Sequence, residues 1–249
     1  MSTFNSSSTL LIEGPKFPSY NFISSSTNQF KINNQAIYLY HSNDLKINDV
    51  VNNDHTIKTA YSVWDASLIL SKFLEKQCNE NKLNFKGKKV IEVGAGKSIP
   101  SIASYILGAS LVTITDVPSV VPEIEKIITL NGFENKNVFA KPLDWINRKE
   151  HIPILINEGP WDYILAADVV WVDYLIEPLI DTISELSTPS HTTLFLCHQT
   201  RTTRSDKLLF DAIENHGWKI HKVSMNELNL AEEFRKDNVE IYRGQKILS

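Results

Sequence analysis

The chain contains few cysteines: only Cys78 and Cys197 occur among its 249 residues, and neither belongs to a Cys-x-x-Cys pair. A disulfide framework needs several cysteines, and a structural zinc site needs clustered cysteine or histidine ligands. We therefore expect neither disulfide bridges nor a metal site. So sparing a use of cysteine favours a reducing compartment, and we expect the cytosol, with the nucleus as a second location.

Long apolar runs and an excess of basic charge are also missing. No run of about 18 apolar residues occurs, so we expect no membrane span. The start, Met1 to Ser8, lacks the basic residues and apolar stretch of a signal peptide. A formal net charge of -4 supplies no broad basic field for nucleic acid. We therefore expect a monomer with no membrane partner and no direct nucleic-acid partner.

The length fits one large domain, or one domain with a short extension. Serine, asparagine and proline dominate the first thirty or so residues, which favours a loose tail. Between Ile37 and Tyr40, aliphatic residues alternate with tyrosines, which indicates a half-buried strand or hairpin. We predict a flexible tail over residues 1–29 and a domain over residues 30–249 that begins with a β-hairpin extension.

Short apolar strands then alternate with helical segments. The predicted strands are 89–93, 111–115, 137–141, 161–167, 192–197, 219–223 and 239–247, and the predicted helices are 64–80, 99–107, 118–130, 174–186 and 206–216. This alternation favours an α/β fold with a largely parallel sheet and helices on both faces. No clear apolar period separates the last two strands, so we predict that the seventh strand runs antiparallel.

Three acidic residues follow or end predicted strands. Glu92 lies beside the turn Gly94-Ala95-Gly96, Asp116 follows the second strand of the repeat, and Asp168 follows the fourth. In open α/β sheets, ligands bind beyond the carboxyl ends of the strands. Glycines let the backbone approach a ligand closely, and Asp116 is placed to bind two ribose hydroxyls. The arrangement predicts a site for a nucleoside-containing cofactor.

Glu92 separates the candidate cofactors. The third glycine of a dinucleotide fingerprint is missing, and an acid at Glu92 would repel the pyrophosphate of a dinucleotide. The same acid favours the positively charged methionyl end of S-adenosylmethionine. A phosphate loop at Gly96-Lys97-Ser98 fails because Ile91 stands where that motif requires glycine. We therefore predict S-adenosylmethionine as the cofactor and interpret Lys97 as an exposed loop lysine.

Several short motifs occur in an order typical of one known family. They are Val63-Trp64-Asp65-Ala66, Val90 to Gly96, Thr113 to Asp116, Leu143-Asp144-Trp145, Ala167 to Trp171, Cys197 to Arg201, 233–235 and 239–241. Together they resemble the seven-β-strand protein lysine methyltransferases of the methyltransferase-like 21 group, in particular the valosin-containing-protein lysine methyltransferase branch. The resemblance covers residues 30–248. It implies a class I S-adenosylmethionine-dependent methyltransferase with a Rossmann-like fold.

The resemblance also implies roles for single residues. Cofactor-binding residues would be Trp64, Gly94, Ala95, Gly96, Asp116, Trp145 and Ala167, in addition to Glu92 from the charge argument. Asp168 and Trp171 occupy the positions of the family's Asp-x-x-Tyr/Phe motif at the methyl-transfer site, and are the predicted catalytic residues. The substrate would be a lysine side chain of another protein. Asp168 would orient the amine and Trp171 would wall its channel.

The sequence departs from the family pattern, which leaves alternatives open. Trp171 stands where tyrosine or phenylalanine is usual, and Lys97-Ser98 replaces the common Thr-Gly. The combination Gly96-x-Ser98-Ile99-Pro100 is similar to the methyltransferase-like 23 branch, which implies an arginine target instead. A non-catalytic partner-binding module on the same fold is a further alternative. Asp168 also has a purely structural interpretation as the cap of the following helix.

Overall fold

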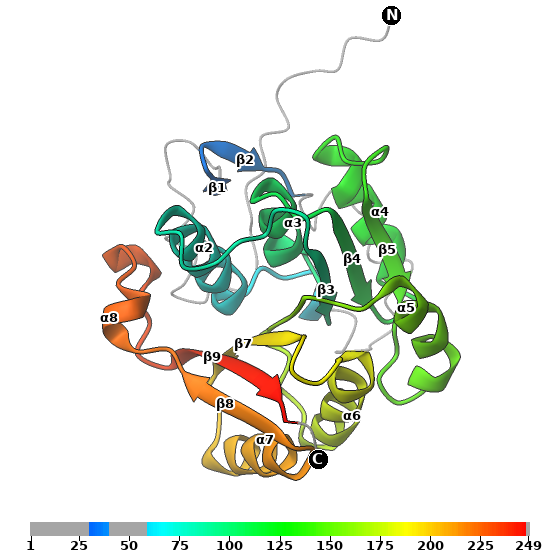
Figure 1. Cartoon of the computed structure of the whole chain (residues 1–249), viewed down its shortest axis with the longest axis vertical. Coiled ribbons are helices and arrows are strands. Elements are labelled where there is room, and N and C mark those ends of the chain that lie inside the picture. The colour runs from blue at the N-terminus through cyan, green and yellow to red at the C-terminus, as the bar shows by residue number, and fades with distance from the viewer. Residues whose placement is uncertain (1–29, 40–58, 248–249) are drawn as a thin grey trace, which may run out of the picture.

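The computed structural model describes residues 30–39 and 59–247, in which a seven-stranded sheet has helices on both faces (Figure 1). The strands are β3 (Lys89–Val93), β4 (Leu111–Asp116), β5 (Val138–Pro142), β6 (Tyr163–Ala167), β7 (Thr193–Gln199), β8 (Trp218–Lys222) and β9 (Val239–Lys246). Their order across the sheet is β5-β4-β3-β6-β7-β9-β8. Strands β3 to β7 are parallel, whereas β9 runs antiparallel to β7 and β8. The predicted fold class and the antiparallel last strand are confirmed.

Two apolar cores lie on the two faces of the sheet. The helices are α2 (Asp65–Asn79), α3 (Ile99–Ile106), α4 (Val121–Leu130), α5 (Ile152–Glu158), α6 (Ile176–Leu186), α7 (Thr203–Asn215) and α8 (Met225–Leu228), with 3-10 turns η3 (Arg148–Glu150), η4 (Asp173–Leu175) and η5 (Glu232–Phe234). Helices α2, α3 and α4 contribute to one core, and α5, α6 and α7 to the other. Val90 of β3 belongs to the first core and Ile91 to the second, because successive strand residues face opposite sides. In the described ranges, no helix is both long and apolar enough to cross a membrane.

Three helices differ from the sequence prediction. Helix α7 begins at Thr203 instead of residue 206, with Thr202 as its N-cap. Helix α4 begins at Val121 instead of residue 118, and the proline in its first turn is Pro122. Residues before it form a turn closed by the Val120 amide on the Val117 carbonyl, at 2.9 Å. Helix α5 was not predicted, because seven residues are too few to show a helical apolar period.

A hairpin of β1 (Phe30–Ile32) and β2 (Gln35–Ile37) packs beside the first core. Asn33 and Asn34 form its turn with φ of 45° and 65°, the left-handed geometry that suits a two-residue hairpin. The Phe30 and Phe234 rings meet edge to face, with centroids 6.2 Å apart. Strand β2 ends at Ile37, so it shares only its last residue with the strand predicted over 37–40. Tyr40 and the predicted tail over 1–29 lie outside the described residues.

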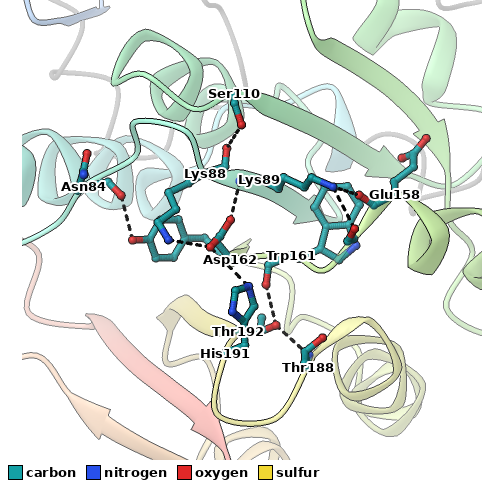
Figure 2. Close-up of polar contacts among 12 residues, drawn as sticks. Asn84, Lys88, Lys89, Ser110, Glu158, Trp161, Asp162, Thr188, His191 and Thr192 are labelled. Atoms are coloured by element: carbon teal, nitrogen blue, oxygen red, sulfur yellow. Dashed lines mark hydrogen bonds and ion pairs between the residues drawn. The ribbon is translucent and has the colours of Figure 1, made fainter.

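A polar network joins the amino ends of β3, β6 and β7 (Figure 2). Asp162 accepts hydrogen bonds from Nζ of Lys88 at 2.8 Å and from the backbone amide of Lys89 at 2.9 Å. Its carboxylate also lies 3.5 Å from Nε2 of His191. Burial alone raises the pKa of Asp162, but the bonds from Lys88 and Lys89 hold it below its ordinary value. The Asp162 carboxylate therefore links the residues at the amino ends of β3, β6 and β7.

Candidate functional site

A cavity of about 540 Å³ opens at the carboxyl ends of β3, β4 and β6. Nine of the ten predicted site residues line it: Trp64, Gly94, Ala95, Gly96, Asp116, Trp145, Ala167, Asp168 and Trp171. Cavities of roughly 300–1,000 Å³ are usual for small-molecule sites. The structure therefore brings these residues together, while the role of each stays a prediction.

The glycine turn after β3 needs glycine at two positions. Gly94 and Gly96 have φ of +62° and +46°, in the left-handed region that other residues rarely adopt. A Cβ at Gly94 would lie 2.8 Å from Cζ2 of Trp145, and one at Gly96 would lie 3.0 Å from the carbonyl oxygen of Ala60. The turn can therefore hold both neighbours this close only because side chains are absent there.

Asp116 is held rigidly at the edge of the cavity. One carboxylate oxygen accepts from the Gly96 amide and the other from the Val117 amide, both at 2.8 Å. Burial raises the pKa of Asp116, and the two amides partly offset that effect. Each oxygen still has a free lone pair. The carboxylate is therefore fixed in place and still able to accept from two hydroxyls of a ligand.

Two tryptophans form walls of the cavity. The ring of Trp145 lies against Gly94, and its Nε1 is buried with no hydrogen-bond partner among the described residues. A buried donor without a partner costs about 1–3 kcal/mol, which a ligand acceptor would offset. Nε1 of Trp64 donates to the Thr59 carbonyl at 2.9 Å. The orphaned donor and the aromatic walls fit a cofactor with a flat, polar ring system.

Glu92 does not line this cavity, and its predicted contact with the cofactor stays a prediction. It is 1% exposed, and its Oε2 accepts from the amide of Ser101 at 2.9 Å and from the Ser101 hydroxyl. Its side chain faces α3, since alternate residues of β3 point to opposite faces. Burial raises the pKa of Glu92 to about 8. The carboxyl group is therefore mostly protonated at neutral pH and supports the start of α3.

Lys97 is also placed differently from its prediction as an exposed loop lysine. Its side chain is 5% exposed and its Nζ lies 3.0 Å from Oε1 of Glu123, which is 2% exposed. The same Nζ lies 5.4 Å from the centroid of the Tyr61 ring. The neighbouring Ser98 has φ of 59°, where the family commonly has glycine. Through these contacts, Lys97 links the glycine turn to α4 and to the segment before Trp64.

Asp168 lies directly after β6 and pairs with Arg201. Its Oδ2 is 2.7 Å from Nη2 of Arg201, whereas its Oδ1 is buried with no partner among the described residues. Burial raises the pKa of Asp168, and the charge of Arg201 opposes that shift. The guanidinium carbon of Arg201 lies 5.3 Å from the centroid of the Trp64 ring. The next helical turn has Val172 as its N-cap and no capping side chain, so Asp168 is not that cap.

Arg201 was not predicted as a site residue. A signal existed: β6 and β7 are parallel neighbours with Ala167 opposite Cys197, so the residues that follow each strand emerge at one edge. Thr59, Ala60 and Ser62 also line the cavity, and no sequence pattern indicated them.

The fold is that of class I S-adenosylmethionine-dependent methyltransferases, and the cavity lies where an open α/β sheet binds its ligand. One solved structure with this fold is the ribosomal protein L11 methylase of Lactobacillus delbrueckii subsp. bulgaricus, with a TM-score of 0.50 at 18% identity over 74% of this chain and 79% of that one. Another is the magnesium protoporphyrin IX methyltransferase of Synechocystis PCC 6803, solved with S-adenosylmethionine bound. It has a TM-score of 0.50 at 15% identity over 79% of this chain and 86% of that one. Likeness at this level of identity shows the fold alone.

The family follows from the sequence comparisons. The family described as lysine methyltransferase matches residues 40–216. EEF1A lysine methyltransferase 3 of Xenopus tropicalis is 34% identical over 72% of this chain and 76% of its own length. Protein N-lysine methyltransferase METTL21A of Danio rerio is 32% identical over 72% of this chain and 79% of its own length. The chain belongs to the lysine methyltransferase family and is an S-adenosylmethionine-dependent protein-lysine methyltransferase, as the resemblance predicted.

Replacement of Glu92 by glutamine tests the buried, neutral state of this carboxyl group. An ordinary glutamate titrates near 4.5, whereas the folded-state pKa of Glu92 is about 8. Between these values the folded state binds more protons than the unfolded state, so the free energy of unfolding falls as pH rises. Between pH 5 and 8, we expect the free energy of unfolding to fall by more than about 1 kcal/mol less in Glu92→Gln than in the wild type.

Urea unfolding of the ligand-free protein at several pH values measures this. Glu125→Gln, on the exposed face of α4, is the matched control and should leave the decline unchanged. An equal decline in the wild type and in Glu92→Gln would show that Glu92 is ionised in the folded state.

Proposed function

We propose that Asp168, Trp171 and Arg201 form the methyl-transfer site, and that it accepts the uncharged ε-amine of a lysine in a partner protein. The observation that carries the proposal is the state of the Asp168 carboxylate. One oxygen is engaged by Arg201, and the other is buried without a partner, in a residue that lines the cavity. A buried acceptor in this state is suited to take a hydrogen bond from an incoming amine.

The site must lower the proton affinity of its target. S-adenosylmethionine supplies an electrophilic methyl group on a sulfonium sulfur, and a free amine lone pair is needed to attack it. Lysine titrates near 10.4, so its ammonium has to lose a proton first. The indole rings of Trp64, Trp145 and Trp171 line the cavity, and burial among apolar groups favours the neutral amine.

Arg201 adjusts how strongly Asp168 attracts charge. A lone buried carboxylate would hold an ammonium tightly and keep it protonated. The guanidinium at 2.7 Å already balances that carboxylate, so Asp168 orients the amine without trapping its cation. Stacking of Arg201 over Trp64 holds the guanidinium in place. Asp168 therefore serves as a hydrogen-bond acceptor and Arg201 as its positioning residue.

Trp171 forms the wall of the proposed lysine channel. It is half-buried and lines the cavity four residues after the end of β6, where it can guide the alkyl chain of a lysine. Tyr174, 66% exposed, lines the same cavity. The Trp171 wall and the exposed Tyr174 ring together suit a lysine that is presented on the surface of another protein.

Further properties of the enzyme follow as proposals. The Xenopus relative is named for EEF1A, which makes EEF1A the first protein substrate to test. The net charge of -4 and the two cysteines support a monomer that acts in the cytosol, with the nucleus as a second location, without binding nucleic acid directly. The division into a tail over 1–29 and a domain over 30–249 stays a prediction.

Asp168→Asn separates catalysis from cofactor binding. The substitution keeps the shape of the side chain but removes its charge, so we expect the methylation rate to fall by about tenfold or more, equivalent to about 1.4 kcal/mol. Affinity for S-adenosylhomocysteine, measured by calorimetry, should change little. Asp116→Ala is the contrasting variant and should weaken that affinity by about 1.5–3 kcal/mol. A folded Asp168→Asn enzyme with the wild-type rate would remove Asp168 from the mechanism.

Trp171 gives a second, independent test of the channel. Trp171→Ala opens the wall and admits water, so we expect at least a tenfold loss of rate, or about 1.4 kcal/mol. Trp171→Phe keeps an aromatic wall and should retain much of the activity. Labelled-methyl transfer to a saturating protein substrate measures both, with thermal melts to confirm folding. Equal losses in the two variants would show that the indole itself, and not an aromatic wall, is required.

A further inference from the structure

A second cavity, of about 510 Å³, lies at the other end of the sheet from the cofactor cavity. Its floor is made by Tyr163 and Thr193, the first residues of β6 and β7, and by residues of β8 and β9. The cofactor cavity is lined by Ala167, the last residue of β6. Four residues of extended strand separate the two positions by about 13 Å. The second cavity is therefore distinct from the methyl-transfer site.

The side chains of this cavity form two rows across the strands. Register places Tyr163, Thr193, Gln245 and Lys219 in one row, and sets Arg243 opposite His221 in the next. We call these six residues the basic groove. Opposed residues on antiparallel strands have Cβ atoms about 4.5–5.5 Å apart, so the groups of each row are close neighbours.

The groove begins where the apolar cover of the sheet ends. On this face of β9, Val239 and Ile241 are buried in the first core, whereas Arg243 and Gln245 follow at the same side-chain period. On β8, Val223 just beyond the strand is likewise buried, while His221 is exposed. The change from apolar to basic residues coincides with the start of the cavity.

The charge of the groove is positive and uncompensated among the described residues. No acidic residue lines the cavity, and the described ion pairs do not include Lys219, His221 or Arg243. Asp162 is the acid next to Tyr163 in the chain, and Lys88 and His191 already engage it (Figure 2). Arg243 is held 5.2 Å above the centroid of the Phe195 ring, so its guanidinium is pre-positioned.

We propose that the basic groove binds an acidic segment of a partner polypeptide. Charge complementarity selects the sign of the occupant. Strand β8 is the last in the sheet order, and an edge strand offers backbone groups to which an extended peptide can bond. A second copy of the chain is disfavoured, because pairing of β8 with β8 would bring two basic strands together. With a net charge of -4, the protein lacks the broad basic field that nucleic acid requires.

The test measures binding and does not depend on methyl transfer. A fluorescent, lysine-free peptide of aspartate and glutamate is titrated with the full chain and followed by anisotropy. We expect saturable binding that weakens with ionic strength. The double variant Lys219→Gln with Arg243→Gln should weaken it about tenfold or more. The single variant Lys219→Glu, at an exposed position that cannot unsettle the core, should also weaken it several-fold.

Lys222→Gln is the matched control, because Lys222 lies on the same strand but pairs with Glu240 and does not line the groove. It should bind the peptide within about twofold of the wild type. Thermal melts establish that each variant is folded. Equal binding by Lys219→Glu and Lys222→Gln, or no preference for the acidic peptide over a neutral one, would overturn the proposal. Tighter binding of a single-stranded oligonucleotide of equal charge would do so as well, in favour of nucleic acid.

Discussion

The geometry of the proposed methyl-transfer site depends on the ion pair between Asp168 and Arg201. Placing a carboxylate in a buried position is costly unless a cation stays beside it. Arg201 is that cation, and it also stacks on Trp64, so one side chain links the end of β6, the loop after β7 and the segment before α2. Loss of the guanidinium would leave a buried charge alone and would remove the cation that stacks on the Trp64 ring. The pair thus holds in place both the proposed acceptor for the substrate amine and one wall of the cavity.

The parallel strands give the two ends of the sheet different properties. At the carboxyl ends, strand termini turn outward and place Asp116 and Asp168 around one cavity, as expected for an open α/β sheet. At the amino ends, Lys88 engages Asp162, and the neighbouring groove keeps only basic and neutral side chains. The antiparallel β9 makes this possible, because its last residues reach the amino ends of β6 and β7. Catalysis and the proposed partner recognition therefore occupy opposite ends of one framework.

Periodicity was enough to predict the α/β fold, and strand-end positions placed the glycine turn, Asp116 and Asp168 at one edge of the sheet. The other predicted lining residues, Trp64, Trp145, Ala167 and Trp171, came from the family resemblance and not from periodicity. Glu92 does not line the cavity, because its side chain two positions before the glycine turn points to the α3 face of the sheet, where burial raises its pKa to about 8. The burial of Lys97 and the site position of Arg201 were missed for another reason: each pairs with an acid far away in the chain. The Arg201 pair can be inferred only once β6 and β7 are known to be neighbours.

In the proposed mechanism, Arg201 supports Asp168, which presents one free oxygen to a lysine amine. Methyl-labelled S-adenosylmethionine with a protein extract, followed by mass spectrometry of the labelled side chains, tests it for the wild type and for Arg201→Gln. We expect label on lysine ε-amines, and a methylation rate about tenfold or more lower in a folded Arg201→Gln enzyme than in the wild type. Label on arginine, or a variant that methylates lysine at the wild-type rate, would contradict it.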